Sequence, residues 1–252
     1  MEPVDEQRIE RVRDVRRRLA EHGPPRTRPY DNDFARVAVP LEDCDALRDL
    51  LVADRVTTVV EVGLAYASSA LAIGEALVTV QGSTSQTPKH VIIDPFQVTD
   101  YGNVGWELLE NAGLADVATL VTEPSSSALP KLVADEFSAD AAFVDGSHRF
   151  HEVFVDLYFL RTIVKPGGLV ILDDYWWPSV RTAVSYYETN LGWASVTDAF
   201  ESVSLDRANG TPRTRAFRLP DPAFEPRFDE FQAFWTSVSL HRPVMPHETG
   251  PA

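Results

Sequence analysis

Hydrophobic positions in the first fifty residues recur at helical spacing. Ile9, Val12, Val15 and Leu19 repeat every three or four residues, which predicts a helix over residues 5–21 with one narrow apolar stripe. Glycine and proline mark residues 22–40 as a loop, and a second helix is predicted over Leu41–Ala53. We therefore expect an N-terminal helical cap, residues 1–54, which covers another part of the molecule.

From Val56 onward, short runs rich in β-branched residues alternate with helical patterns. The predicted strands are Val56–Gly63, His90–Asp94, Val117–Val121, Ala141–Asp145 and Leu169–Asp173, followed by two antiparallel strands at Ala194–Phe200 and Arg215–Leu219. The predicted helices are Ser68–Val78, Val104–Ala112, Ser126–Phe137, residues 150–164 and Trp177–Leu191. Repeated strand–helix–strand units predict an α/β fold, a doubly wound and mostly parallel seven-stranded sheet, over residues 55–220.

The last stretch, residues 221–252, is a tail rich in proline and aromatic residues. Phe228, Phe231, Phe234 and Trp235 have helical spacing, so these side chains are expected to pack on the domain or on a partner subunit. A place at the mouth of a substrate site is the alternative. With the N-terminal stripe, this tail suggests a homodimer.

Composition narrows the class of protein. The 252 residues include 23 Lys and Arg against 38 Asp and Glu, a formal net charge of −15, which argues against nucleic acid and anionic membranes as partners. Cys44 is the only cysteine, so an internal disulfide and a cysteine-rich zinc site are excluded. No apolar run approaches a membrane span and Met1 does not open a signal peptide, so a cytoplasmic location is expected.

Polar and small residues follow the predicted strands where a parallel sheet binds its ligands. In the first turn, small side chains at Gly63, Ala65 and Ala67 let the backbone approach a ligand closely. The Gly-x-Gly-x-x-Gly fingerprint is missing, which disfavours a nicotinamide oxidoreductase. Asp94 ends the second strand, where a carboxylate can accept both hydroxyls of a ribose. The combination indicates a nucleoside ligand without a pyrophosphate, such as S-adenosylmethionine.

The motifs together resemble those of class I methyltransferases. They are Glu-x-Gly-x-Ala at residues 61–65, Ile-Asp-Pro at 93–95, Phe-Val-Asp-Gly-Ser-His at 143–148, Lys-Pro-Gly-Gly at 165–168 and Asp-Asp at 173–174. The nearest subgroup is that of macrocin-type and cephalosporin-pathway enzymes of natural-product assembly, and the resemblance covers residues 55–190. Ala65 and Ala67 depart from the pattern, since this superfamily usually has more glycine in the turn.

The resemblance implies a set of cofactor-binding residues. Glu61 and Gly63 would lie along the methionine part with Ala65, Tyr66 and Ser68, and Asp94 would hold the ribose. Ser125 or Ser126 would lie near the adenine, and Asp145 and His148 would complete the site.

Three carboxylates raise the question of a metal ion. Asp145 ends one strand, and Asp173 and Asp174 end the next, so their side chains could share Mg²⁺ or another hard divalent cation. Related methyltransferases use such a set to orient a substrate hydroxyl. In the alternative without a metal, Asp145 helps bind the cofactor and Asp174 caps the following helix.

His148 is the candidate general base, with Asp145 beside it, because an imidazole can take a proton from a hydroxyl near neutral pH. We therefore expect methyl transfer to a small-molecule acceptor, with oxygen ahead of nitrogen as the atom methylated. A methyltransferase fold that only binds its ligand is the alternative. The sequence does not identify the acceptor.

Overall fold

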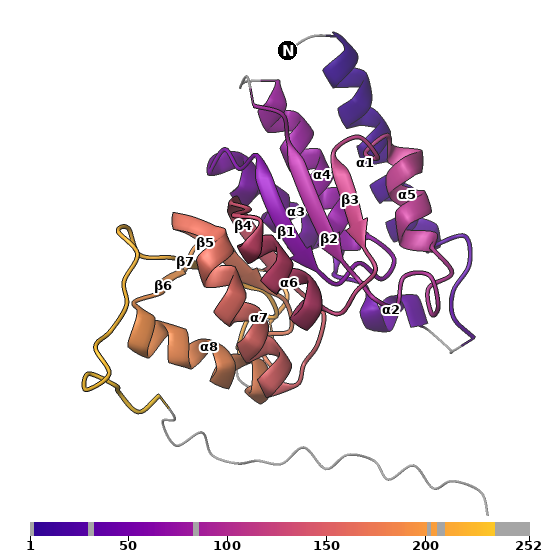
Figure 1. Cartoon of the computed structure of the whole chain (residues 1–252). Helices are drawn as coiled ribbons and strands as arrows, with labels where there is room; N and C mark the ends of the chain where they lie inside the picture. The colour runs from indigo at the N-terminus through magenta and orange to yellow at the C-terminus, as the bar shows by residue number, and fades with distance from the viewer. Residues whose placement is uncertain (1–2, 30–32, 83–85, 201–202, 206–209, 235–252) are drawn as a thin grey trace, which may run out of the picture.

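Seven strands form one sheet in the order β3-β2-β1-β4-β5-β7-β6 (Figure 1). The computed structural model describes residues 3–29, 33–82, 86–200, 203–205 and 210–234. The strands are β1 Thr58–Val62, β2 Lys89–Ile93, β3 Ala118–Val121, β4 Ala139–Val144, β5 Val164–Leu172, β6 Ala194–Val196 and β7 Arg215–Arg218. The first five are parallel, whereas β7 runs antiparallel to both β5 and β6. The predicted seven-stranded, mostly parallel sheet is confirmed.

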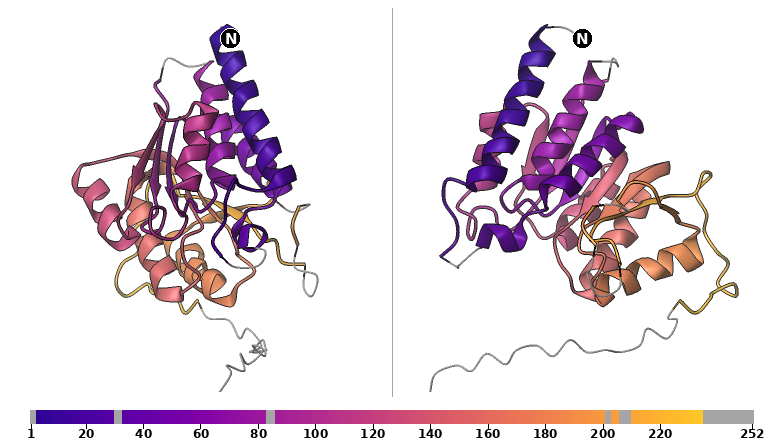
Figure 2. Two further views of the ribbon diagram at one scale, coloured as in Figure 1. Left: turned by 90° about the vertical axis from the view of Figure 1, so that its right-hand side faces the viewer. Right: turned by 180° about the vertical axis from the view of Figure 1, so that it is seen from behind.

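Helices cover both faces of this sheet (Figures 1 and 2). They are α1 Pro3–His22, α2 Asp33–Val37, α3 Leu41–Ala53, α4 Ser68–Gln81, α5 Val104–Ala112, α6 Ser125–Ala134, α7 Phe150–Ile163 and α8 Pro178–Leu191. One layer contains α1, α3, α4 and α5, and the opposite layer contains α6, α7 and α8. Because both faces are covered, β1 and β4 are nearly continuous runs of buried residues.

The apolar stripe of α1 is buried within the chain itself. Ile9, Val12, Val15 and Leu19 are each at most 5% exposed and pack in one cluster with residues of α4 and α5. Arg16 on the same helix pairs with the fully buried Glu75 of α4. The stripe therefore gives no reason to expect a partner subunit.

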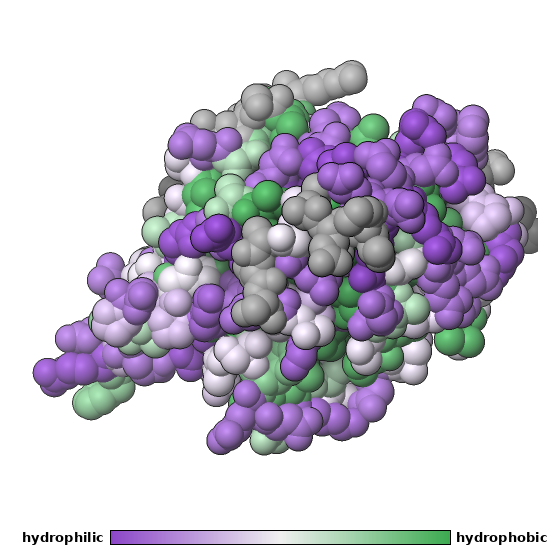
Figure 3. Space-filling view, turned by 90° about the horizontal axis from the view of Figure 1, so that it is seen from above, coloured by the Kyte–Doolittle hydropathy of each residue, from purple (hydrophilic) through white to green (hydrophobic). Residues whose placement is uncertain are grey.

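The surface seen from above in Figure 3 is largely hydrophilic, with smaller apolar areas between. No helix among the described residues is both long and apolar enough to cross a membrane.

Several element boundaries differ from those predicted. The loop at residues 22–40 contains the short helix α2, and β5 begins at Val164 because Gly167, with φ of 74°, lets the strand continue through the Pro-Gly-Gly turn. The strand predicted to reach Phe200 ends at Val196.

The C-terminal aromatic residues that the structure describes do not lie on a helix, although their spacing is helical. Residues 222–234 contain no helix, Phe228 is 96% exposed, and Phe234 contacts Tyr186 of α8 with ring centroids 5.5 Å apart. Trp235 lies outside the described residues. The tail also contacts the domain through the ion pair of Glu225 with Arg161 and through hydrogen bonds between Gln232 and Asn190.

Candidate functional site

A polar cavity of about 150 Å³ lies where β1, β2, β4 and β5 end. Its lining includes seven of the ten residues predicted to bind the cofactor, namely Gly63, Ala65, Tyr66, Ser68, Asp94, Asp145 and His148. Asp174, Arg36 and Arg213 complete the charged part of the wall. The strand ends thus bring distant segments of the sequence to one place.

A larger groove of about 1100 Å³ opens beside the polar cavity. Its walls include Pro95 and Phe96 after β2, and Ser125 and Ser126 at the start of α6. Gly63, Gly146 and His148 border both the groove and the cavity. An extended ligand can therefore pass from one to the other without leaving the protein surface.

Gly63 determines how closely the first turn approaches the neighbouring strand end. Its φ is +100°, and a Cβ atom there would lie 2.4 Å from the carbonyl oxygen of Asp145. Only glycine fits such a position. Ala65 and Ala67 adopt φ of 44° and 64°, so two alanines hold the left-handed conformation that the resemblance assigns to glycine.

Asp94 supports the first turn from the end of β2. Its Oδ2 accepts the backbone N–H groups of Leu64 at 3.1 Å and Ala65 at 3.0 Å, and its Oδ1 accepts that of Phe96 at 2.8 Å. The carboxylate lines the polar cavity although it is only 4% exposed. Contact with a ribose would use the remaining lone pairs of these oxygens.

Glu61 lies beneath the turn instead of in the cavity. Its side chain is fully buried, accepts a hydrogen bond from the Ser69 hydroxyl at 2.6 Å, and lies 2.8 Å from Nε2 of His90. It lines neither the cavity nor the groove. In this structure, Glu61 joins β1 to β2 and α4 and so supports the turn from below.

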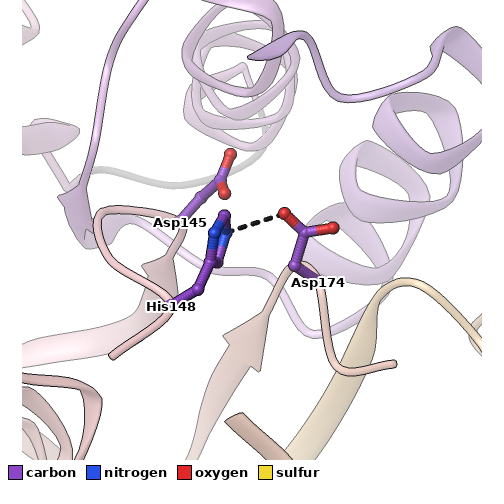
Figure 4. A group of neighbouring side chains, drawn as sticks. All are labelled: Asp145, His148 and Asp174. Carbon is purple, nitrogen blue, oxygen red and sulfur yellow. Dashed lines mark ion pairs between the residues drawn. The ribbon is translucent and has the colours of Figure 1, made fainter. Parts of the chain in front are cut away.

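Asp145, His148 and Asp174 converge on the polar cavity (Figure 4). Each offers a ligand atom, and these atoms lie within 4.8 Å of one another. His148 Nε2 is 2.7 Å from Asp174 Oδ2, and its ring stacks on Trp177 with centroids 5.9 Å apart. Two carboxylates and an imidazole can hold a divalent cation or handle a proton.

The three groups change one another's acidity. The hydrogen bond to Asp174 raises the pKa of His148 above its ordinary value. Burial alone would raise the pKa of Asp174, but the hydrogen bond from His148 and the charge of Arg213 lower it overall. Burial, reinforced by the charges of Asp173 and Asp174, raises the pKa of Asp145.

The structure separates Asp173 from this group, which corrects the predicted trio of carboxylates. Asp173 is 2% exposed, and Arg213 binds both of its oxygens at 2.8–3.1 Å, while the Thr214 hydroxyl donates at 2.7 Å. Successive residues of an extended chain point to opposite sides. Asp174 has already left the strand with φ of 50°, and it faces the cavity.

Ser125 and Ser126, which were predicted to lie near the adenine, line the groove. Behind them is Asp156 of α7, which is 2% exposed and also borders the groove. Burial raises the pKa of Asp156 to about 6, although a hydrogen bond with Ser125 opposes the shift.

Several residues of the site were missed by sequence reasoning. Arg213 comes from the segment before β7, and only its position ahead of an antiparallel strand could have indicated its place. Buried Gln97 donates to the Ala65 carbonyl at 2.9 Å and accepts from the Gly105 N–H at 3.0 Å. Nothing in the local sequence distinguishes this glutamine from an ordinary loop residue.

The segment before α2 also closes onto the cavity. Tyr66, whose ring lines the cavity, donates its hydroxyl proton to Asp33 and accepts the Arg28 backbone N–H at 2.9 Å. The Arg28 guanidinium pairs with Asp33 at 2.6 Å and lies 4.5 Å from the centre of the Tyr101 ring. Hydrogen bonds thus attach the loop predicted at residues 22–40 to Tyr66 in the first turn.

Comparison with known proteins supports this description. Residues 60–175 match the sequence profile of a family described as "Methyltransferase domain". No curated protein sequence matches the chain.

Solved structures of O-methyltransferases share the fold. The enzyme from Bacillus cereus in complex with SAH is 13% identical, with a TM-score of 0.58 over 85% of this chain and 90% of that one. TomG from Streptomyces achromogenes, involved in tomaymycin synthesis and solved with SAM, is 15% identical, with a TM-score of 0.58 over 84% and 89%. CalS11, a TDP-rhamnose 3′-O-methyltransferase of calicheamicin biosynthesis, is 18% identical, with a TM-score of 0.52 over 86% and 95%. At these identities, the likeness establishes the fold.

The sheet order is that of the class I methyltransferase fold, which the O-methyltransferase structures share. The match to the methyltransferase-domain family, over residues 60–175, includes Gly63, Asp94 and Asp145 of the cavity wall.

Proposed function

We propose that the protein transfers a methyl group from S-adenosylmethionine to a hydroxyl oxygen of a small molecule. The observation that carries this proposal is the pairing of His148 with Asp174 beside Asp145, at the wall of a cavity that also contains the glycine turn. TomG and CalS11, which act in natural-product synthesis, have the same fold, and this supports a natural-product acceptor.

The cofactor would lie across the cavity and the groove. Gly63, Ala65, Tyr66 and Ser68 line the part that suits the methionine end, and Arg36 supplies a positive charge for its carboxylate. Asp94 lines the cavity, the next residues Pro95 and Phe96 line the groove, and Ser125 and Ser126 line the part that suits the adenine. Glu61 would support the first turn from its buried side, through its contacts with Ser69 and His90.

When bound, S-adenosylmethionine supplies an electrophilic methyl group on its sulfonium. The protein has to align the acceptor and to receive its proton, and alignment is the larger part of such catalysis. His148 takes the proton from the acceptor hydroxyl, and Asp174 fixes the ring and stabilises the imidazolium that forms. Asp145 lies at the cavity wall, where a cationic sulfonium would favour the ionised form of this carboxyl group.

A divalent cation is a second candidate for activating the hydroxyl. Two carboxylates and one imidazole fit such an ion by their chemistry, and Asp145, His148 and Asp174 would hold it. The ion would lower the pKa of the acceptor hydroxyl and fix its direction. Because the set includes an imidazole, Mn²⁺ fits at least as well as Mg²⁺.

Calorimetric titration with S-adenosylhomocysteine tests the cofactor site. Asp94→Ala is expected to weaken binding by at least about tenfold, because the turn loses its carboxylate support. Asp135→Ala, an exposed residue that follows α6, serves as the control and should bind as the wild type does. If the wild-type protein fails to bind, the proposed function is wrong.

The choice between base and metal depends on two measurements. His148→Ala should reduce kcat by about 10²-fold or more on either route, because His148 is the base in one and a metal ligand in the other, so activity that persists in EDTA identifies His148 as the base. Loss of activity on EDTA treatment, restored by Mn²⁺ or Mg²⁺, would instead establish the metal-assisted route. Transfer to amines but not to hydroxyls would show that the enzyme methylates nitrogen.

Three further points remain part of the proposal. The cap of residues 1–54, the domain of residues 55–220 and the extension of residues 221–252 are offered as units of organisation. A homodimer and a cytoplasmic location are also proposed, the dimer on the basis of the C-terminal aromatic residues alone.

A further inference from the structure

An apolar hollow of about 250 Å³ lies next to the polar cavity, beneath α2. Its lining comes from the N-terminal helices and α4, and includes Leu19, Phe34, Ala38, Cys44 and Leu71. The hollow and the polar cavity share three wall residues, Val39, Ser68 and Arg213. The hollow therefore adjoins the cavity that contains His148 and Asp174.

The acceptor needs space that the polar cavity does not offer. With a volume of about 150 Å³, this cavity is already assigned to the methionine end of the cofactor. The groove on the other side of His148 is assigned to the adenosine part. A molecule that brings a hydroxyl to His148 must therefore extend in another direction, and the hollow lies along one.

The size of the hollow fits an aromatic group. An apolar cavity of roughly 150 Å³ holds one benzene molecule, so 250 Å³ corresponds to one or two fused rings. The lining is mostly aliphatic, with the Phe34 ring in one wall, and this suits a flat apolar ligand. A sugar would leave its hydroxyls without partners against such a surface.

The charged groups at the edge of the hollow already have partners. Arg16 pairs with Glu75 and, at 2.7 Å, with Asp45, while Arg213 pairs with Asp173 at 2.8 Å. An anionic ligand would have to displace one of these carboxylates. The net charge of −15 also disfavours the approach of anions. Both observations favour a neutral group.

We propose that the hollow beneath α2 binds the aromatic part of a neutral hydroxylated acceptor, one to two rings in size, and directs its hydroxyl toward His148. This inference rests on the proposed function and adds the substrate class. Segment 33–40, which separates the hollow from the polar cavity, would then select the acceptor.

The test measures binding of 2-naphthol and of methyl α-rhamnoside by calorimetry, in the presence of saturating S-adenosylhomocysteine. The wild-type protein should bind 2-naphthol saturably and should not bind the glycoside. Ala38→Phe and Ala35→Phe, which place a ring in the hollow from two positions, should each weaken naphthol binding by about tenfold or more. Their affinity for S-adenosylhomocysteine should change by less than about twofold. Ala53→Phe, at an exposed position on α3, is the matched control.

The outcomes distinguish failure of the proposed function from failure of this inference alone. If S-adenosylhomocysteine itself does not bind, the proposed function fails and this inference fails with it. If it binds while 2-naphthol does not, or if both hollow-filling variants bind naphthol as Ala53→Phe does, the inference alone is overturned. Binding of the glycoside instead of naphthol also overturns it. Should Ala38→Phe not fold, Ala35→Phe decides, because Ala35 lines the hollow but is itself exposed, so that a larger side chain there does not disturb the core.

Discussion

Gly63 is the residue at which the site tolerates the least change. Its left-handed φ and its contact with the Asp145 backbone are independent constraints, and any side chain violates both of them. Gly192, at the end of α8, shares only the first constraint, since its φ is +69° and a Cβ atom at that position would have no neighbour within 4 Å. The two glycines therefore form a natural comparison.

Gly63→Ala is expected to reduce the free energy of unfolding by at least about 3 kcal/mol, because strain and steric overlap add. Gly192→Ala should cost only about 1–2 kcal/mol from strain alone. Urea denaturation of the two variants measures the difference. Equal losses would show that the approach of the first turn to Asp145 is looser than described.

Asp156 links acidity to stability at the far end of the groove. Its folded pKa of about 6 lies above the ordinary value of 3.8, so the folded protein holds a proton that the unfolded chain has released between these two values. Folding stability must therefore fall as the pH rises through this window.

We expect Asp156→Asn to remove this component of the pH dependence. Between pH 4 and pH 6, the wild-type protein should lose about 2–3 kcal/mol more than the variant does, since one pKa unit corresponds to about 1.4 kcal/mol. Unfolding free energies measured at several pH values supply the comparison. Parallel curves for the two proteins would mean that Asp156 titrates as an ordinary carboxyl does.

At the scale of elements, helix α2 and the turn before it depend on a few polar contacts. The Tyr66 hydroxyl joins Asp33 to the Arg28 backbone, and both of those residues come from the segment that sequence patterns mark only as a loop. Five residues are too few for helical periodicity to be detected. The element that adjoins the reaction cavity was therefore invisible to pattern analysis.

Tyr66→Phe should loosen this segment without unfolding the domain. The change removes both hydrogen bonds and leaves the buried Asp33 carboxylate with Arg28 alone, at an expected loss of about 1–3 kcal/mol. Amide hydrogen exchange over residues 33–40 should become faster, while that of β1 and β4 stays unchanged. Tyr158→Phe, half exposed on α7, is the control for loss of a phenol. Unchanged exchange in both variants would show that other contacts hold α2.

The long elements were predictable for a clear physical reason. The β1 and β4 strands and helices α4, α5, α7 and α8 bury continuous or periodic apolar residues, so their patterns carry the signal directly. The directions of the side chains at the strand ends were harder to predict from the sequence. Asp173 and Asp174 are adjacent and Arg213 pairs with both of them, yet only Asp174, in its left-handed conformation, also reaches His148. Arg213 is brought to the site by chain topology, which local sequence does not encode.

At the scale of the whole molecule, the N-terminal helices and the sheet domain share their cores. Leu47 and Leu51 of α3 pack in one cluster with residues of α4 and the central strands, and α1 packs in another with α4 and α5. The buried pair of Arg16 and Glu75 adds a polar link between α1 and α4. The predicted boundary near residue 54 therefore divides the sequence, but it does not divide the hydrophobic core.

We accordingly expect one cooperative unfolding transition. Far-ultraviolet circular dichroism and tryptophan fluorescence should give coincident urea curves for the wild-type protein. Glu75→Gln, which leaves Arg16 with Asp45 as its carboxylate partner, should lower the midpoint of both curves together, with a loss of about 1–3 kcal/mol. An early loss of helical signal that precedes the fluorescence change would mean that the cap unfolds separately.

The antiparallel direction of β7 has a consequence for how such a protein can diversify. A parallel strand ends at the ligand edge of the sheet, whereas β7 begins there, so the connection ahead of it can deliver a side chain such as Arg213. The glycine turn and Asp94 belong to strands on the other side of β4. Substitution of Arg213 would therefore change the wall that the polar cavity shares with the apolar hollow, while the glycine turn and Asp94, on the other side of β4, keep their positions.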